Sequence, residues 1–366
     1  MGPPSDVIAA EGGATRAPPL PYIPAVTDSS KPTPHILVVR FSAIGDILLT
    51  TPLLRALRAR YPAAWITALT KEQYLPLLSH NPHVNEVIGI GSGESVRQVA
   101  ERLRRAGYTH RLDLHGSLRS LALRRLVPGR WTTYSKRRLA RALLIATKRD
   151  FYRADVPVAE RYFEAAAQLD VRPDGASPEF FLSPEAPSDA SSWLMRTGAG
   201  ARSLVAIAPG AAHATKRWPV GHWIELTRRL TSTEASVVVL GGSEDVTIAK
   251  AIVAGAGPRV FTAAGQLTLQ QTGALLQRAS ALVCGDTGVM HMATAVGTPV
   301  VALFGPTVRQ LGFFPYRARR ATVVERDLGC RPCTAQGSSR CPLGHHRCMR
   351  EIVPAAVTAT LAEMLA

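Results

Sequence analysis

Residues 281–306 have types and an order that suit the binding of a phosphate group. An apolar run of strand type, 281–284, precedes the turn formed by Asp286, Thr287 and Gly288, and a helical pattern follows this turn. A turn between the carboxyl end of a strand and the N-terminus of a helix offers free backbone N–H groups, which favour an anion. The segment therefore predicts a phosphate-binding turn, with helix capping by Asp286 as the alternative.

Asp46 and Lys216 follow two other predicted strands. Asp46 ends the turn after strand 36–41, where a carboxylate can accept the proton of an attacking hydroxyl group as a general base. Its alternative role is to cap the helix predicted over 47–60. Lys216 lies in a loop of the second half, where its ammonium group can neutralise a leaving diphosphate as a point charge. A solvated surface lysine is the alternative.

The remaining candidate residues also lie at predicted strand or helix ends. Glu244 follows a glycine turn, where a carboxylate can bind a ribose hydroxyl or an adenine edge, although helix-start charge explains it equally well. His291 lies one turn into its helix and can reach a phosphate or be a satisfied buried histidine. Asp113, His115 and Arg119 leave an N-terminal strand on the side expected for an acceptor, with turn chemistry as the alternative.

Four cysteines cluster near the C-terminus, at Cys330, Cys333, Cys341 and Cys348. The first pair has the C-x-x-C spacing of a zinc site, whereas the second pair is spaced more widely than is usual. A structural zinc, a redox-labile thiol cluster and plain packing all remain open.

The positive charge of the chain is concentrated in one segment. The formal net charge is +16, and residues 97–153 contain 16 Lys or Arg against 3 acids, so most of the excess lies there. Such a segment suits nucleic acid, an anionic membrane surface or a phosphorylated substrate, unless it is only a solvated surface. Nucleic acid ranks last because few aromatic residues interleave the arginines. No signal peptide or spanning segment is apparent, which predicts a cytoplasmic protein.

Two sets of alternating strands and helices must position these residues. This alternation predicts an α/β fold with two parallel sheets whose carboxyl ends face a common cleft. The predicted organisation is a disordered extension (1–34), a first Rossmann-like domain (35–171), a linker (172–201), a second Rossmann-like domain (202–349), and a C-terminal helix (350–366) that can pack back on the first domain.

Five segments together resemble glycosyltransferase family 9, and they occur in the order of that family. The resemblance runs from residue 36 to about residue 354, and its C-terminal part is most similar to the second heptosyltransferases of the family. The segments are R-F-S-A-I-G-D-I-L-L-T-T-P (40–52), D-L-H-G-S-L-R-S (113–120), P-G-A-A-H-A-T-K-R-W-P (209–219), D-T-G-V-M-H-M-A-T-A through G-T-P-V-V-A-L-F-G-P-T (286–307), and C-R-P-C through C-P-L-G-H-H-R-C-M-R (330–350).

The resemblance implies a GT-B fold and an inverting transfer of heptose from ADP-heptose to a phosphorylated lipid A–Kdo acceptor of the lipopolysaccharide inner core. It implies that Asp46 is the general base, that no catalytic metal or other cofactor is needed, and that the enzyme works on the cytoplasmic face of the inner membrane. The residues implied to bind the donor are Lys216, Glu244, Asp286, Thr287, Gly288 and His291. A GT-B nucleotide-sugar epimerase and, less strongly, a nucleic-acid-binding protein are the alternative functions.

Overall fold

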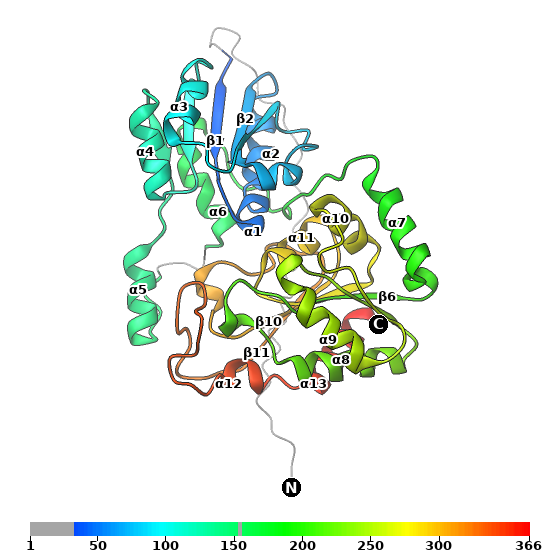
Figure 1. Ribbon diagram of the computed structural model, residues 1–366. Helices are drawn as coiled ribbons and strands as arrows, with labels where there is room; N and C mark the ends of the chain where they lie inside the picture. The colour runs from blue at the N-terminus through cyan, green and yellow to red at the C-terminus, as the bar shows by residue number, and fades with distance from the viewer. Residues whose placement is uncertain (1–32, 153–155) are drawn as a thin grey trace.

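Two parallel sheets form the centres of two domains in the computed structural model, which describes residues 33–152 and 156–366 (Figure 1). The strand orders are β3-β2-β1-β4-β5 in the first sheet and β11-β10-β9-β6-β7-β8 in the second. The α/β class with two facing domains is therefore confirmed. The extension predicted over 1–34 lies outside the described residues except for its last two positions.

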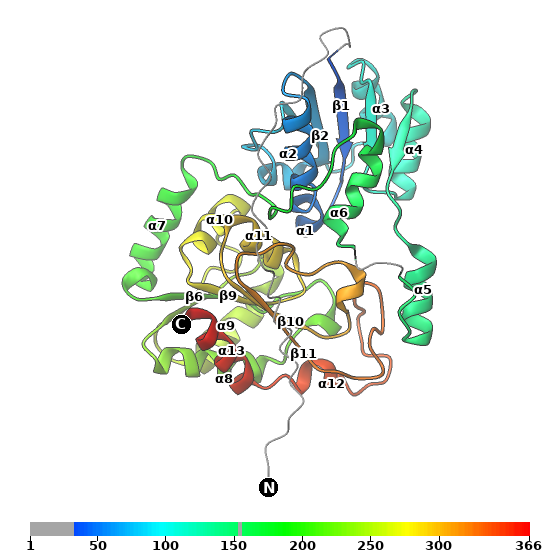
Figure 2. The same ribbon diagram turned by 180° about the vertical axis from the view of Figure 1, so that it is seen from behind.

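The first domain places helices on both sides of its sheet (Figure 2). Its strands are β1 (His35–Val39), β2 (Trp65–Lys71), β3 (Glu86–Ile90), β4 (His110–Asp113) and β5 (Trp131–Thr133). Its helices are α1 (Ile44–Leu48), α2 (Thr51–Arg60), η1 (Glu72–Leu77), α3 (Val96–Arg104), α4 (Leu118–Leu126), α5 (Arg138–Thr147), α6 (Val158–Arg161) and η2 (Tyr162–Leu169).

The second domain repeats this arrangement, and its central strands are buried at every position, as expected for a parallel sheet covered on both faces. Its strands are β6 (Leu204–Ala208), β7 (Ser236–Val239), β8 (Val260–Thr262), β9 (Ala281–Gly285), β10 (Val300–Phe304) and β11 (Ala321–Glu325). Its main helices are α7 (Ala186–Thr197), α8 (Val220–Ser232), α9 (Val246–Ala256), α10 (Leu269–Arg278), α11 (Gly288–Val296), α12 (Arg347–Arg350) and α13 (Pro354–Leu365).

Strand order explains why the candidate residues gather at two points. In each sheet the order of the strands changes direction between two neighbouring central strands. These are β1 and β4 in the first domain, and β6 and β9 in the second. Loops that leave the carboxyl ends of such neighbouring strands diverge and open a crevice. Asp46 follows β1, Lys216 follows β6 and Asp286 follows β9, so all three lie at these crevices.

The helix predicted over 47–60 is two helices, and this changes the position of Asp46. Pro52 has no N–H group to donate to the carbonyl of Leu48 four residues earlier, and that carbonyl accepts the Thr51 hydroxyl at 2.7 Å instead. The chain therefore breaks between α1 and α2. Because α1 begins at Ile44, Asp46 is the third residue of the helix and not its N-cap.

The predicted linker, 172–201, contains a helix that the Pro- and Ser-rich sequence did not suggest. Helix α7 buries Ala190, Trp193 and Leu194, which recur at helical spacing, and it packs against α10 of the second domain. The indole N–H of Trp193 donates to Gln266 at 3.1 Å. The second half of the segment thus belongs to the second domain.

The C-terminal helix also belongs to the second domain, which corrects the expectation that it can pack back on the first. Helix α13 packs against α8, β10 and β11. Its buried residues Val357, Leu361 and Met364 join the apolar cluster on that side of the second sheet. Within the part of the chain that the structure describes, no helix has the length and apolar character needed to cross a bilayer.

Candidate active site

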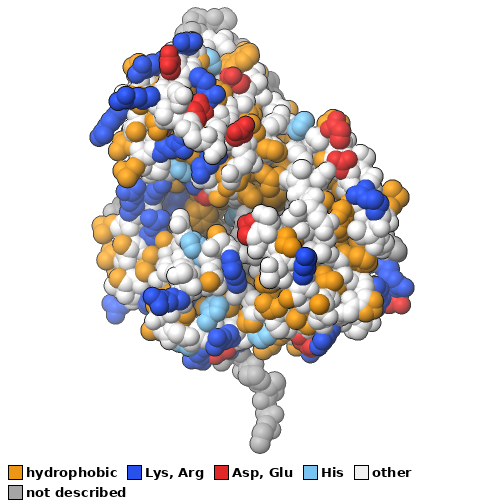
Figure 3. All heavy atoms as spheres, viewed as in Figure 1, with side chains coloured by type: hydrophobic (Ala, Val, Ile, Leu, Met, Phe, Trp, Pro, Cys, Tyr) orange, Lys and Arg blue, Asp and Glu red, His pale blue; other side chains and the backbone are white. Residues whose placement is uncertain are grey.

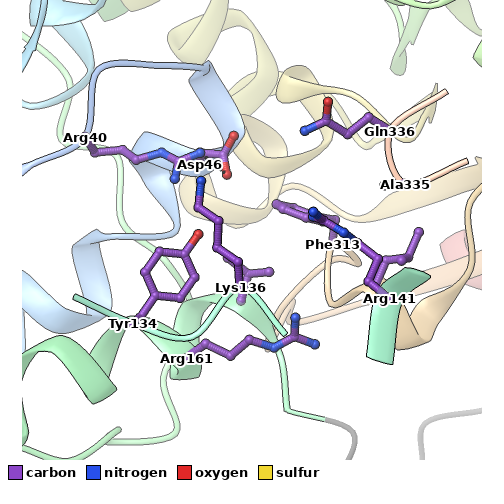
Figure 4. Close-up of a pocket in the computed structure, with 11 residues that line it drawn as sticks. Arg40, Asp46, Tyr134, Lys136, Arg141, Arg161, Phe313, Ala335 and Gln336 are labelled. Atoms are coloured by element: carbon purple, nitrogen blue, oxygen red, sulfur yellow. Dashed lines mark ion pairs between the residues drawn. The ribbon is translucent and has the colours of Figure 1, made fainter. Parts of the chain in front are cut away.

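Asp46 lies in the first turn of α1, and its carboxylate is directed toward the space between the domains (Figure 4). Its Oδ1 accepts from the Arg40 guanidinium at 2.6 Å and from the Tyr162 hydroxyl at 3.3 Å. The backbone N–H of Ala43 donates to Oδ2 at 3.4 Å, which is too long for a strong cap. The side chain stays 21% exposed, so a substrate hydroxyl can reach it.

A cavity of about 290 Å³ joins Asp46 to the predicted donor-binding turn. Its volume is at the lower end of the range for small-molecule sites in proteins. The walls come from both domains: α1 contributes one side, and the loops after β6, β9 and β10 contribute the other. The predicted donor residues that line it are Lys216, Asp286, Thr287, Gly288 and His291.

Asp286 makes side-chain contacts that a simple helix cap would not make. Its Oδ2 accepts from the Lys216 ammonium at 2.6 Å and from the Thr307 hydroxyl at 2.8 Å. Thr287 is the N-cap of α11, and its side chain makes no capping hydrogen bond. Asp286 therefore positions Lys216 in the cavity wall and leaves the backbone N–H groups of α11 free for a ligand.

Two buried polar atoms at this turn lack hydrogen-bond partners among the described residues, namely Thr287 Oγ1 and His291 Nδ1. Burial lowers the pKa of His291, which is 3% exposed, so its ring is neutral. Unpaired buried polar atoms are rare in proteins and often mark ligand sites. Together with the uncapped N-terminus of α11, they make this turn suitable for a phosphate.

Two glycines allow α1 and α11 to come into close contact across the domain junction (Figure 1). A Cβ at Gly45 would lie 2.4 Å from Cδ2 of His291, and a Cβ at Gly288 would lie 2.8 Å from Cβ of Ile44. From the sequence, Gly288 was expected to leave room for a phosphate. In the structure, the atoms that a side chain at Gly288 would meet belong to Ile44 and Gly45 of the first domain, so glycine is required there for domain contact.

Of the predicted acceptor residues, Asp113 proves to be a turn residue. Its carboxylate is fully buried, and its Oδ1 accepts from the backbone N–H groups of His115 and Gly116 at 3.0 and 2.9 Å. Its Oδ2 has no hydrogen-bond partner among the described residues and lies 3.8 Å from the Arg124 guanidinium, so acceptor binding by Asp113 stays a prediction. The alternative of turn chemistry accounts for the contacts of Oδ1.

His115 and Arg119 both pack on the ring of Phe41, and neither lines the cavities described here. Burial lowers the pKa of His115 to about 4, and the nearby cations of Arg40 and Lys136 lower it further. The Arg119 guanidinium donates to the carbonyl of Glu94 at 2.7 Å. Acceptor binding by His115 and Arg119 therefore stays a prediction from their position after strand β4.

A second, smaller cavity adjoins Asp46 and is strongly basic (Figure 4). Arg40 is paired with Asp46, whereas Lys136, Arg141 and Arg161 form no ion pair with any described carboxylate. Burial lowers the pKa of Lys136, the nearby cations of Arg40 and Arg138 lower it further, and its ammonium group donates to the carbonyls of His115 and Gly116. The arrangement can therefore hold an anionic group beside the carboxylate of Asp46.

The cysteine-rich segment braces the loop that carries Lys216. Thr215 exchanges hydrogen bonds with Ser338, and its carbonyl contacts Nε2 of His346 at 2.8 Å. The thiols are free, burial raises the pKa of Cys348 to about 11, and Cys330 Sγ lies 4.0 Å from His345 Nε2. Among the described residues, no three His, Cys, Asp or Glu side chains are grouped as metal ligands. Zinc binding therefore stays a prediction, which a measurement of zinc in the purified protein would test.

Glu244 lies in the short helix η5 (Ser243–Asp245) at the carboxyl end of β7, outside the lining of both cavities. Its side chain is exposed beside Ser243. A nucleoside that extends from the α11 turn along the carboxyl edge of the second sheet would approach it. Contact with a ribose or an adenine remains a prediction.

Several residues of the two cavities were not among those predicted from the sequence. Arg40 stands in the same motif as Asp46, and its place at the end of β1 could have identified it. Thr307 ends the motif that begins at Asp286, so its contact with that residue was also open to prediction. No sequence feature separates Lys136 or Arg141 from the other cations of the basic segment.

The sequence and the structure are similar to those of known glycosyltransferases. The family model described as glycosyltransferase family 9 (heptosyltransferase) matches residues 96–343. Lipopolysaccharide heptosyltransferase 2 of Salmonella typhimurium is 29% identical over 349 residues, which cover 90% of this chain and 98% of that protein. The structure of ADP-heptose lps heptosyltransferase II from E. coli has a TM-score of 0.72 and 28% identity, covering 90% of this chain and 98% of that one.

A family 9 glycosyltransferase from Veillonella parvula shares the fold, with a TM-score of 0.76, 21% identity, and coverage of 91% of this chain and 97% of that one. Two Rossmann-like domains that meet at a shared cavity define this protein as a GT-B glycosyltransferase. The chain belongs to glycosyltransferase family 9, as its motifs predict, and its similarity to heptosyltransferase II is confirmed. Membership of this family favours a transferase over the alternative of an epimerase.

Proposed function

We propose that this protein transfers heptose from ADP-heptose to the inner core of lipopolysaccharide, with inversion at the anomeric carbon. The observation that carries the proposal is the cavity shared by Asp46 of the first domain and the α11 turn of the second. The relatives named above as heptosyltransferases, which align with nine-tenths of the chain, support the choice of heptose.

The diphosphate of the donor would lie between the Lys216 ammonium and the N-terminus of α11. Lys216 donates to the carboxylate of Asp286 at 2.6 Å and to its backbone carbonyl at 3.3 Å, which leaves one of the three N–H donors of the ammonium group for a ligand. The free N–H groups of α11 add the positive end of its dipole. These groups stabilise the negative charge that develops on the leaving ADP, so we expect no requirement for a catalytic metal.

Asp46 would act as the general base. As the acceptor oxygen bonds to the anomeric carbon, its proton passes to the carboxylate, while the bond from that carbon to the diphosphate breaks and ADP leaves with the electron pair. Arg40 and Tyr162 hold the carboxylate in position for this transfer. A single displacement of this kind inverts the configuration of the sugar.

The acceptor would be a phosphorylated, lipid-anchored saccharide of the lipid A–Kdo type. The basic cavity of Lys136, Arg141 and Arg161 offers positive charge beside the proposed base. Charge complementarity with an acidic sugar or phosphate supports this location. An acceptor with a lipid anchor requires that the enzyme work at the anionic inner membrane, which we propose it reaches from the cytoplasm.

The test supplies purified protein with ADP-heptose and a truncated lipid A–Kdo acceptor and follows ADP and product by mass spectrometry. We expect transfer by the unaltered protein, and a loss of at least about 1,000-fold in turnover for Asp46→Asn with donor binding retained. Asp170→Asn is the matched control because Asp170 is exposed and its left-handed backbone conformation also suits asparagine. Near-normal turnover of Asp46→Asn would remove this residue from the mechanism.

A further inference from the structure

Helix α5 exposes apolar residues that a helix on a soluble domain usually buries. Seven of its ten residues, RLARALLIAT, are apolar, yet only Leu144 is fully buried. Leu139 is 75% exposed, and it shares one helical face with the exposed Ala142 and Ala146. Figures 1 and 2 show α5 at the edge of the molecule, away from both sheets. Its outward face is therefore an apolar surface that no described residue covers.

Helix α4 extends this surface along the same edge of the molecule (Figures 1 and 2). Leu118 is 86% exposed and Leu121 is 38% exposed, and the two residues lie on one face of α4 together with the exposed Arg125. Two successive helices thus direct leucines to solvent. Exposed apolar residues that gather in this way usually mark an interaction surface.

The charge around these leucines indicates the kind of partner. Residues 118–151 contain ten Lys or Arg and one acid, Asp150, so the surface attracts anions and repels a second copy of itself. Basic residues stand at both ends of α5, with Arg137 and Arg138 at its start and Lys148 and Arg149 just after its last residue. Figure 3 shows Lys and Arg side chains interspersed with hydrophobic ones along this edge. An apolar helical face with basic flanks is typical of helices that lie in the interface of an anionic membrane.

We propose that α4 and α5 form a membrane-docking surface for an anionic bilayer. The outward leucines enter the boundary between headgroups and acyl chains, and the flanking Lys and Arg contact the headgroup phosphates. The value of docking for catalysis rests on the function proposed above. Arg141, on the inward side of α5, lines the cavity at Asp46, so docking would bring a lipid-anchored acceptor next to that carboxylate.

The experiment measures flotation of the full chain with vesicles, without any nucleotide sugar. We expect binding to phosphatidylethanolamine–phosphatidylglycerol vesicles and little binding to phosphatidylcholine vesicles. The double variant Leu118→Ser/Leu139→Ser should weaken the partition coefficient about 100-fold, since each leucine contributes roughly tenfold. Met195→Ser is the control, because Met195 is 74% exposed on α7, on the opposite side of the molecule (Figure 1).

A second measurement separates docking from transfer. With a deacylated, water-soluble acceptor, the double variant should match the unaltered protein, whereas transfer to a vesicle-embedded acceptor should fall with its vesicle binding. The docking surface is disproved if the unaltered protein does not bind anionic vesicles, if the double variant binds them equally well, or if these leucines instead mediate self-association. A protein that binds vesicles through these leucines but transfers no heptose would keep the docking surface and refute the proposed function.

Discussion

Replacing Gly45 with alanine should separate the two walls of the cavity without removing any group that contacts substrate. The added Cβ would lie 2.4 Å from Cδ2 of His291, whereas two carbon atoms in contact need about 3.5 Å. The imidazole ring of His291 cannot move aside easily because this residue of α11 is only 3% exposed and is closely surrounded by other atoms. We therefore expect α1, which carries Asp46, to move away from α11 by about 1 Å.

The expected size of the effect differs between stability and activity. Alanine favours a helix over glycine by about 1 kcal/mol, while overpacking costs about 1–3 kcal/mol, so the net loss of stability should be about 0–2 kcal/mol. A displacement of about 1 Å between reacting groups can lower the rate about 100-fold. Activity should therefore fall far more than stability does.

The assay combines kcat, from ADP release, with the melting temperature. Gly221→Ala is the matched control because Gly221 also lies early in a helix, α8, and a Cβ there would meet no atom within 4 Å. We expect this control to retain its kcat and to melt at the same or a slightly higher temperature. A Gly45→Ala protein that behaved like the control in both measurements would show that the α1–α11 contact does not set the geometry of the site.

Three further variants test individual groups. Lys216→Met should lose stability by about 2–3 kcal/mol, because Asp286 is left buried and unpaired, and should bind the donor at least about tenfold more weakly; the double variant Lys216→Met/Asp286→Asn should regain the melting temperature but not donor affinity in calorimetry. Tyr162→Phe removes the 3.3 Å hydrogen bond to Asp46 and should lower kcat about threefold to tenfold with an unchanged KM for the donor; an equal change in both constants would argue against a positioning role. The pKa of His115 is about 4 in the folded protein and higher in the unfolded chain, so the unfolded chain binds more protons between about pH 4 and 6.5. Stability from this residue is thus complete above about pH 6.5 and is lost as the pH falls toward 4, and urea titrations of His115→Gln should show a weaker pH dependence across that range.

The sequence predicted the gathering of Asp46, Lys216 and the α11 turn because the rule for parallel sheets is topological. Residues that follow neighbouring strands meet at one edge. Strand β6 pairs with β9 up to Ala208 opposite Cys284, so Lys216 and Asp286 come together although they are 70 positions apart. The N-cap of α10 is a similarly local feature, since the side chain of Thr268 accepts from the N–H of Gln271 three residues later. Local chemistry and strand order suffice for these features.

Other features depend on contacts between domains, which periodicity does not encode. The basic cavity at Asp46 forms only when α5 and the loop around Phe313 face each other, so Lys136 looked like any other cation of its segment. For Asp113, the sequence shows a carboxylate at a strand end but not its burial. Helix α7 was missed because its Ser- and Pro-rich sequence has low helix propensity and is stabilised by packing on α10.

The most direct test of the account is a crystal structure of this protein with a non-transferable ADP-heptose analogue. We expect the diphosphate to lie between the Lys216 ammonium and the N-terminus of α11, with the anomeric carbon facing Asp46 at a separation of about 4–6 Å, which leaves room for an acceptor hydroxyl. A diphosphate bound away from the α11 turn, or a sugar directed away from Asp46 in the closed protein, would contradict the proposed active site.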